Sequence, residues 1–234
     1  METARTRPFG LVTGLGVGAG IFYYKALVDA HLRRGLSPRL LMVHADVRYV
    51  LARAAAGKAR ELAEYLAGLL QQLARGGAEI ASIPAFTPQI CAAELACIAP
   101  LPLIGLLDAI AAEVERRRFH RVALFGGRVT METRMFGRLS GTEVILPTPE
   151  EIDTIADIYG RVVEESRASD EDFNRLRYLA HTLIQRERLD GIVLAGTDLA
   201  FVFNPGNTDF PSIDGARVHI DAIMLELAPS TVAG

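Results

Sequence analysis

Residues 9–20 read Phe9-Gly-Leu-Val-Thr-Gly-Leu-Gly-Val-Gly-Ala-Gly20, and a stretch of similar form, Val122-Ala-Leu-Phe-Gly-Gly127, occurs halfway along the chain. In each, a short apolar run leads into glycines and then into a longer amphipathic segment. This order is typical of a strand, a tight turn and a helix. The same alternation continues through the chain, which predicts parallel sheets covered by helices on both faces.

The expected elements follow from apolar runs and helical periodicity. We expect strands at 9–13, 39–43, 79–83, 101–106, 121–125, 143–146 and 191–194. We expect helices at 21–34, 58–75, after Pro88, and at 108–118, 130–139, 149–165, 170–188 and 216–227. The fold class predicted is α/β, with two pseudo-symmetric Rossmann-like lobes. Ligands of such sheets bind beyond the carboxyl ends of the strands, so the site is expected in a cleft between the lobes.

Composition narrows the class of protein. The formal charge is −3 and no dense basic run occurs, which argues against nucleic acid or an anionic membrane as the main partner. No apolar stretch reaches the roughly 18 to 20 residues needed to span a bilayer. The N-terminal segment lacks the form of a secretory signal, and two cysteines suit a reducing compartment. A cytoplasmic location is therefore expected.

Seven segments, taken together in order and spacing, resemble the cofactor-independent aspartate/glutamate racemase family over nearly the whole chain. They are the opening glycine turn with Tyr23 and Tyr24, Asp46-Val-Arg48, Ile83–Gln89, Gly126–Met131, Leu146–Pro149 with Ile158 and Tyr159, Leu194–Asp198, and Asp214 with His219. The resemblance implies one lobe from residues 1–108 plus 215–234 and another from 109–214. It also implies an isomerase that binds a small carboxylate or amino acid without pyridoxal phosphate or metal, as a possible homodimer.

The family's chemistry uses two cysteines, one from each lobe. This chain has Ala85 where the first belongs and Thr197 where the second belongs. Alanine carries no proton, and a threonine hydroxyl is a far weaker acid than a thiol. Cys91 and Cys97 follow later in the chain, on the helix after this loop, and do not replace the missing thiols easily. The usual two-thiol mechanism is therefore not expected here.

Several residues are candidates for binding a substrate carboxylate. Thr87 and Thr130 match family positions whose hydroxyls and neighbouring N–H groups do so, although both could simply cap helices. Arg48 could pair with a distal carboxylate, or be a solvated loop residue. Phe86 and Gln89 stand in the altered family segment. Phe86 could fill part of the pocket or stack on a flat substrate.

Four residues are candidates for proton transfer. His44 ends a strand that points toward the cleft, and histidine titrates near neutral pH. Thr197 and Asp198 follow a buried strand, where Asp198 could act as a base or either residue could cap a helix. His219 fits the family's closing pattern and would face the first lobe, with Asp214 orienting it or supporting the loop. For each, the alternative is a structural role.

A dinucleotide fingerprint is another interpretation of Gly14–Gly20, with Asp46 touching a ribose. The same glycines are expected in the racemase family, where the backbone approaches the substrate. We therefore expect a racemase-like isomerase that acts at the carbon next to a carboxylate, by proton transfer without cysteine. The alternative is a catalytically silent homologue that binds a carboxylate metabolite or a protein. A related decarboxylase or cis–trans isomerase is a third possibility.

Overall fold

The structure is a computed structural model that describes residues 6–227; the outermost residues of the predicted first lobe, 1–5 and 228–234, lie outside this range. Its strands are β1 Phe9–Thr13, β2 Leu40–His44, β3 Ile80–Ser82, β4 Arg121–Gly126, β5 Glu143–Val144, β6 Gly191–Ala195 and β7 Ser212–Asp214. Its α-helices are α1 Val17–Arg33, α2 Val47–Ala55, α3 Ala59–Arg75, α4 Ala92–Ile98, α5 Leu106–Arg116, α6 Arg128–Glu132, α7 Pro149–Glu165, α8 Asp170–Glu187 and α9 Gly215–Glu226. Short 3-10 helices are η1 Thr87–Cys91, η2 Met135–Gly137 and η3 Thr197–Phe201.

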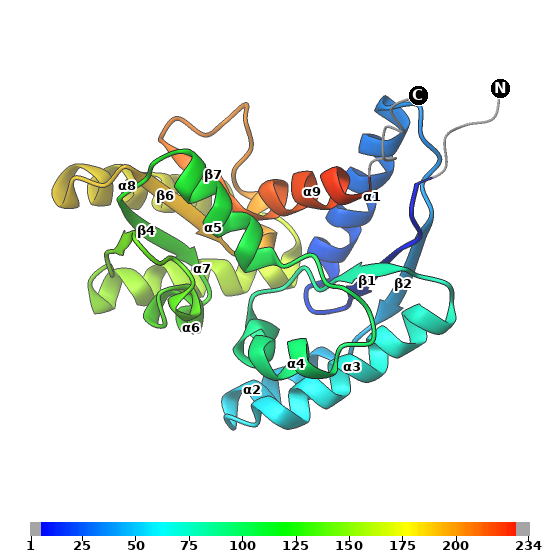
Figure 1. The fold of residues 1–234 in the computed structure, drawn as a ribbon. Coiled ribbons are helices and arrows are strands. Elements are labelled where there is room, and N and C mark those ends of the chain that lie inside the picture. Colours follow the sequence, from blue (N-terminus) through cyan, green and yellow to red (C-terminus); the bar gives the residue numbers. More distant parts are fainter. Residues whose placement is uncertain (1–5, 228–234) are drawn as a thin grey trace.

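Two separate parallel sheets form the two lobes, which confirms the predicted fold class (Figure 1). The first sheet has the order β2-β1-β3 and the second the order β5-β4-β6-β7. The first strand of each lobe along the chain, β1 or β4, lies inside its sheet with a neighbour on either side. The glycine turns that follow these strands therefore lie at the carboxyl edge of each sheet, where ligands of such folds bind.

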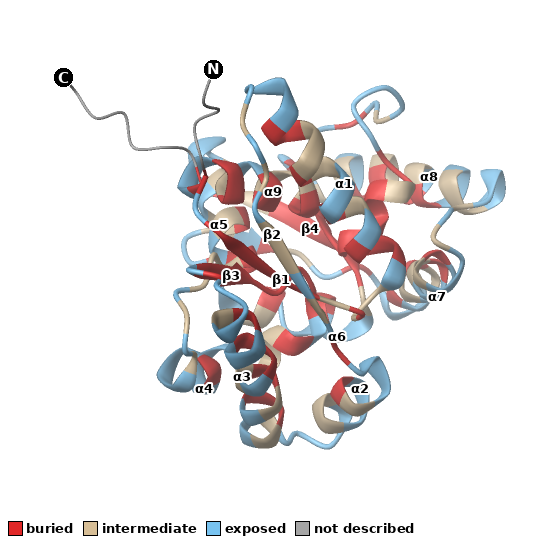
Figure 2. Ribbon diagram, turned by 90° about the vertical axis from the view of Figure 1, so that its right-hand side faces the viewer, coloured by how far each residue is buried: buried red, intermediate tan, exposed pale blue. Residues whose placement is uncertain are grey.

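The first lobe buries both faces of its sheet. Helix α3 packs on one face through a leucine stripe, and α1 and α9 pack on the other (Figures 1 and 2). The stripe consists of Leu62, Leu66, Leu69, Leu70 and Leu73. Ala216, Ile220, Ile223 and Met224 of α9 share a core with Phe9 and Leu11 of β1. This contact supports the return of the C-terminal helix to the first lobe, while the exact lobe boundaries stay a prediction.

Local signals explain the helices of the second lobe. Helix α7 begins with a capping box in which Thr148 and Glu151 bond each other's backbone, followed by a proline in the first turn. Helix α8 begins with Ser169, whose hydroxyl accepts from the N–H of Asp172. One core joins these helices, the second sheet and α5, and it also includes Phe86 from the first lobe. The two lobes therefore share packing at the end of β3.

The structure differs from the predicted elements at several points. Helix α1 begins four residues earlier than expected, and α2 was not predicted at all. The expected strand 101–106 pairs with β3 only through an isolated bridge between Ala81 and Leu103. The expected helix 130–139 is broken, because Arg134 has a φ of 50° and the next two residues are also left-handed. Strand β7 was missed because only three residues separate Pro211 from α9.

Candidate active site

Asp198 lies at the junction of the two lobes. It follows β6 in the second lobe, is only 2% exposed, and its Oδ1 accepts from the backbone N–H of Ala19 at 3.1 Å. Ala19 is in the first turn of α1, whose cap residue Gly16 has no side chain to offer. A side chain on Gly16 would begin 2.9 Å from the Asp198 carboxylate, so the carboxylate lies directly against this turn. Burial raises the pKa of Asp198 to about 6, against the opposing effect of these hydrogen bonds.

His44 reaches the same turn from the first lobe. It ends β2, pairs in register with Thr13 of β1, and is exposed. A side chain on Gly14 would begin 2.7 Å from Cε1 and 2.8 Å from Nδ1 of the His44 ring. Gly14 has a φ of 87°, which glycine adopts without strain. The turn Gly14–Gly16 therefore has a histidine against its start and a carboxylate against its end, one from each lobe.

Thr197 and Tyr159 complete the second lobe's side of the junction. Thr197 is 3% exposed, and its hydroxyl donates to Oδ2 of Asp198 at 3.5 Å. Tyr159 of α7 lies on the same side of the junction, and burial holds the pKa of this tyrosine well above its usual value, with a further contribution from Asp198. The tyrosine ring covers Gly196, where an added side chain would begin 2.4 Å from it.

The two candidate threonines differ in their surroundings. Thr130 is buried in the short helix α6 after β4, and β4 pairs with β6 up to Gly126 and Ala195. Thr130 therefore follows the strand next to the one that carries Thr197. Thr87 is exposed at the start of η1, after the first lobe's β3. Neither side chain caps its own helix, so the capping alternative is not what the structure shows.

The segment that carries Ala85 is tightly held. Phe86 is 5% exposed and packs in the core of the second lobe. The Gln89 amide donates to the carbonyl of Ala85 at 2.9 Å and to that of Ile83 at 3.4 Å. Its nitrogen therefore fixes this loop. Gln89 also lines an apolar cavity of about 510 Å³ between α4 and residues 99–106.

Arg48 belongs to a helix rather than to the expected loop. Asp46 caps α2, its Oδ1 accepting from the N–H of Arg48 at 2.9 Å and of Tyr49 at 3.2 Å. The Arg48 side chain is exposed at this end of the first sheet. The dinucleotide interpretation is disfavoured, because Asp198 places negative charge at the helix start where a pyrophosphate would bind, and Asp46 is used as a cap.

His219 is fully buried, away from solvent. Its Nδ1 lies 3.0 Å from the Tyr23 hydroxyl, and its Nε2 lies 2.9 Å from Ser82 Oγ and 3.1 Å from the carbonyl of Ile104. Burial lowers the pKa of His219 to about 4, so the ring is neutral at physiological pH. These contacts match the structural alternative for His219, which faces the first lobe as expected. Asp214 caps α9 by accepting from the N–H of Arg217 at 3.1 Å.

Neither cysteine is placed to replace the missing thiols. Cys91 is fully buried in the first lobe's core, its Sγ donates to the carbonyl of Pro88, and burial raises its pKa to about 11. Cys97 is exposed on α4. Within residues 6–227, no group of three or more histidine, cysteine or acidic side chains is arranged to hold a metal ion. Over the same residues, no helix combines the length and apolar character needed to cross a bilayer.

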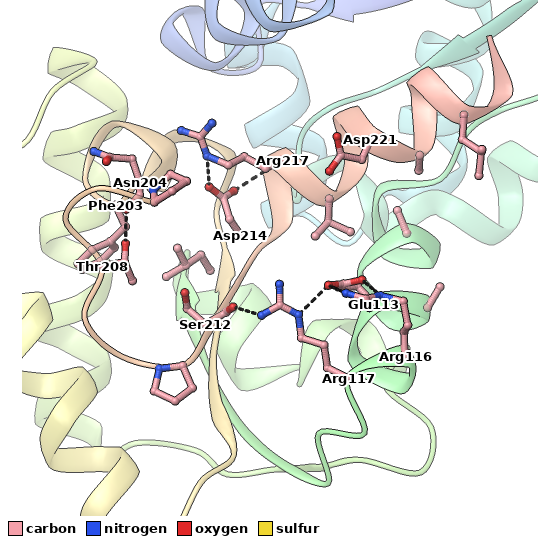
Figure 3. A pocket seen from close by; sticks show the side chains of 18 of the residues that line it. Glu113, Arg116, Arg117, Phe203, Asn204, Thr208, Ser212, Asp214, Arg217 and Asp221 are labelled. Carbon is pink, nitrogen blue, oxygen red and sulfur yellow. Dashed lines mark hydrogen bonds and ion pairs between the residues drawn. The ribbon is translucent and has the colours of Figure 1, made fainter. Parts of the chain in front are cut away.

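A large cavity of about 930 Å³ lies apart from this junction, between α5, α9 and the loop before β7 (Figure 3). Its charged groups pair largely with one another. The Arg117 guanidinium donates to Glu113 and to the carbonyl of Ser212, and Arg217 pairs with Asp214 at 2.9 Å. None of the nine candidate site residues lines it. We therefore place the candidate active site at the lobe junction and not in this cavity.

Comparison with known proteins identifies the family. Residues 12–223 match the family model described as Asp/Glu/Hydantoin racemase, so the chain belongs to this family. A search among curated proteins gave no match. Membership supports a racemase-like isomerase function at the level of the family.

Solved structures share the fold. A Yersinia pestis protein classed with the Asp/Glu racemases superposes with a TM-score of 0.82 at 22% identity, covering 95% of this chain and 100% of its own. An aspartate racemase homologue from Pyrococcus horikoshii OT3 gives 0.77 at 22% identity, covering 94% and 99%. The aspartate racemase of Picrophilus torridus gives 0.71 at 15% identity, covering 94% of each chain.

Sequence reasoning gave no role to Tyr159 and Ser82. Tyr159 lies within an amphipathic helix, where its spacing is that of a core residue, and Ser82 lies within a strand. The available signal was Gly196, because a side chain at this position would collide with the Tyr159 ring. An added side chain would begin 2.4 Å from that ring at Gly196 and 3.7 Å from it at Gly127.

Proposed function

We propose that this protein is an isomerase that moves a proton at the carbon α to the carboxylate of a small amino or carboxylic acid, with Asp198 and His44 as the proton carriers. One observation supports this most directly: the two side chains come from opposite lobes and contact the same turn, Gly14–Gly16. Two carriers on opposite sides of one carbon are what inversion requires. The two-lobed fold of the family provides that arrangement.

The chemistry of the two groups suits this role. Because the pKa of Asp198 is raised to about 6, its carboxylate is a stronger base than an ordinary aspartate and still ionises near neutral pH. The imidazole of His44 has one nitrogen that can accept a proton and one that can donate it. Each group could therefore remove a proton in one direction of the reaction and supply one in the other.

The proposed step conserves atoms and charge. One carrier takes the α-proton, and the electron pair of the broken C–H bond passes into the substrate's carboxylate as an enediolate. The other carrier then delivers a proton to the opposite face, which re-forms the C–H bond. The developing negative charge falls on the substrate carboxylate, for which Thr130, Thr87 and Arg48 are the proposed contacts.

Substrate entry requires the lobes to part. Asp198 is 2% exposed and bonded to α1, so no substrate carbon reaches it in the arrangement described here. The relatives named as racemases of aspartate, and the glutamate racemase solved with D-glutamate, suggest the first compounds to test. Because Phe86 fills space beside Ala85, substrates other than aspartate belong in the panel.

A catalytically silent homologue is the second candidate function. It is favoured by Ala85, which replaces a proton carrier with a methyl group, and by the burial of Phe86 next to it. Such a protein would bind a carboxylate metabolite between the lobes without moving a proton. The two proposals differ in one observable, which is loss of the α-hydrogen to solvent.

The test is incubation in heavy water with single enantiomers of amino acids and with dicarboxylic acids, followed by proton NMR of the α-position. The proposal predicts exchange with at least one compound, and Asp198→Asn should slow the exchange of one of its enantiomers at least about 100-fold. Asp157→Asn, an exposed aspartate on α7, is the matched control. Thermal stabilisation by a compound that shows no exchange would favour the silent homologue. Exchange that Asp198→Asn leaves at the wild-type rate for both enantiomers would contradict the assignment of Asp198.

A further inference from the structure

We propose that Phe201 is a positioning residue for Asp198: it docks the short helix η3 on the first turns of α1, so that the carboxylate meets the N–H of Ala19 each time the lobes close. The catalytic meaning of this inference rests on the proposed function. The docking itself can be measured without any substrate. Helix α1 of the first lobe contacts α7 and η3 of the second lobe, and Figure 1 shows the end of α7 next to the start of α1.

Asp198 and Phe201 lie three residues apart in η3. In a 3-10 helix, side chains at this spacing lie on the same face. Both of them contact α1. Oδ1 of Asp198 accepts from the N–H of Ala19 at 3.1 Å, and Cε2 of Phe201 lies 2.9 Å from where a side chain on Gly18 would begin. One face of η3 therefore places a carboxylate and an aromatic ring against the same helix.

The surface of α1 that receives the Phe201 ring is formed by Gly18 and Phe22, which are one helical turn apart. The ring centroids of Phe201 and Phe22 are 6.0 Å apart with an angle of 69° between the planes, which is a favourable edge-to-face arrangement. The guanidinium of Arg217 on α9 lies 5.3 Å from the centroid of the Phe22 ring. Phe22 is therefore in contact with α9 as well, which makes it a well-held partner for Phe201.

This aromatic pair joins the cores of the two lobes. Phe201 packs against the core of the second lobe, and Phe22 packs against the core that β1, α1 and α9 share. When Asp198 takes a proton, the attraction between its charge and the start of α1 is lost, whereas the contact between the rings does not depend on that charge. The pair therefore holds the acid in one place in both of its protonation states, as proton transfer to and from one carbon requires.

Gly18 shows how closely the lobes approach at this contact. A side chain there would begin 2.4 Å from Oγ and 2.8 Å from Cβ of Ser166, the cap residue of α7, in addition to its overlap with the Phe201 ring. Alanine is ordinarily the better helix former, so the glycine serves the contact between the lobes rather than the helix. Gly18→Ala should therefore push η3 away from α1 while leaving both proposed proton carriers in the protein.

The readout is the NMR signal of the Ala19 amide proton in the whole protein, followed between about pH 4 and pH 8, where Asp198 ionises. Ala19 is the third residue of α1, so its N–H has no partner within the helix and reports on the bond to Asp198. The signal should move with pH in the wild type and stay in place in Asp198→Asn. We expect Phe201→Leu to reduce this movement to less than about half, because a hydrogen bond weakens steeply when its geometry is lost.

Two comparisons separate positioning from a general loss of stability. Tyr178→Leu, at an exposed ring of α8, should keep the full movement. A less stable variant in which η3 stays docked should also keep it, because the signal is that of the folded protein. A folded Phe201→Leu protein in which the Ala19 signal moves as far as in the wild type would overturn the proposal.

Gly18→Ala tests the same contact from the side of α1 and decides if Phe201→Leu does not fold. It should also reduce the movement of the Ala19 signal, and full movement in this variant would overturn the proposal. The control is Gly68→Ala in α3, where no atom of the described residues lies within 4 Å of the added side chain. The heavy-water assay reports separately on the proposed function. Reduced movement in Phe201→Leu without exchange of any compound would reject the isomerase and keep the docking role of Phe201.

Discussion

The carboxylate of Asp198 in the second lobe accepts a hydrogen bond from the backbone N–H of Ala19 in the first lobe, with 3.1 Å between nitrogen and oxygen. Helix α1 has no cap from its own chain segment, because its cap residue is Gly16. A side chain from the other lobe supplies the cap. The group proposed to move a proton is therefore also one that joins the lobes, so its protonation and the contact between lobes are coupled.

The variant Asp198→Asn should change how stability depends on pH. The pKa of Asp198 is raised from 3.8 to about 6 in the folded protein, so between these values the folded state binds more protons than the unfolded chain. Its contribution to stability is therefore greatest below pH 4 and is lost as pH rises through about 6. At pH 7, Asp198→Asn should be more stable than the wild type by roughly 1 to 3 kcal/mol.

Urea unfolding at pH 7 and pH 4 checks this. The stability that Asp198→Asn gains over the wild type should be smaller at pH 4 than at pH 7. The control Asp157→Asn should be as stable as the wild type at both pH values. Since asparagine keeps an acceptor for the N–H of Ala19, loss of the cap is not expected to mask the effect. Equal stability of Asp198→Asn and wild type at pH 7 would mean that the carboxyl carries no burial penalty.

The titration of His219 should change the free energy of unfolding with pH in the direction opposite to that of Asp198. Its pKa is lowered from 6.5 to about 4 by burial, so the unfolded chain binds more protons in this window and stability falls as pH drops. In Asp198→Asn the opposing contribution is gone, and acidification from pH 6.5 to 4 should destabilise this variant more than the wild type. A variant less acid-sensitive than the wild type would be the contrary result.

Replacing His219 tests the buried network that it forms. His219→Phe leaves the buried hydroxyl of Tyr23 without its partner, while Ser82 keeps its bond to the carbonyl of Ile104; the change should lower the free energy of unfolding by about 2 to 4 kcal/mol. His120→Gln, at an exposed histidine, is the control and should have little effect. A His219→Phe protein as stable as the control at pH 7 would show that these bonds contribute little.

The two cysteines should differ sharply in reactivity and matter little to function. Cys97 is exposed, whereas burial raises the pKa of Cys91 to about 11. A thiol reagent should label one cysteine in the folded protein and the second only after unfolding. Any α-hydrogen exchange should survive this labelling. Exchange abolished when a disulfide reagent modifies the thiols, and restored when an added thiol reductant removes the modification, would mean that a cysteine takes part after all.

Restoring the family's cysteines tests whether the pocket kept its geometry. In a protein that carries both Ala85→Cys and Thr197→Cys, we expect exchange of the α-hydrogen of aspartate or glutamate that becomes sensitive to thiol reagents. Thiols suit this reaction because both protonation states are accessible near neutral pH. Either single variant should exchange the α-hydrogen more slowly than the double variant, since each lobe must supply one proton carrier. A folded double variant that remains inactive would point to Phe86 as the obstacle.

The sequence predicted the fold well because the decisive signals are local. An apolar run followed by glycines marks both central strands, and the alternation of runs implies parallel sheets. Local patterns were not enough where the backbone turns unexpectedly. Nothing in residues 130–139 marks Arg134 as left-handed, and α2 is a short helix whose cap, Asp46, was considered for other roles.

The candidate site was predicted in part. His44 and Asp198 were singled out from their places after strands, and the structure brings both to the turn Gly14–Gly16. For the other residues, the role depends on whether the side chain is buried. Burial is set by contacts between segments that are far apart in the sequence. Such contacts place His219 among Tyr23 and Ser82, and they set Tyr159 against Gly196; no spacing along the chain reveals either arrangement.

The most direct test follows exchange from each enantiomer of whichever substrate shows activity in heavy water, in the wild type, Asp198→Asn and His44→Gln. With one carrier on each face, the account predicts that Asp198→Asn loses exchange from one enantiomer, His44→Gln loses it from the other, and both lose racemisation. If either variant racemises at the wild-type rate, or if both slow the two enantiomers equally, His44 and Asp198 are not the opposed carriers.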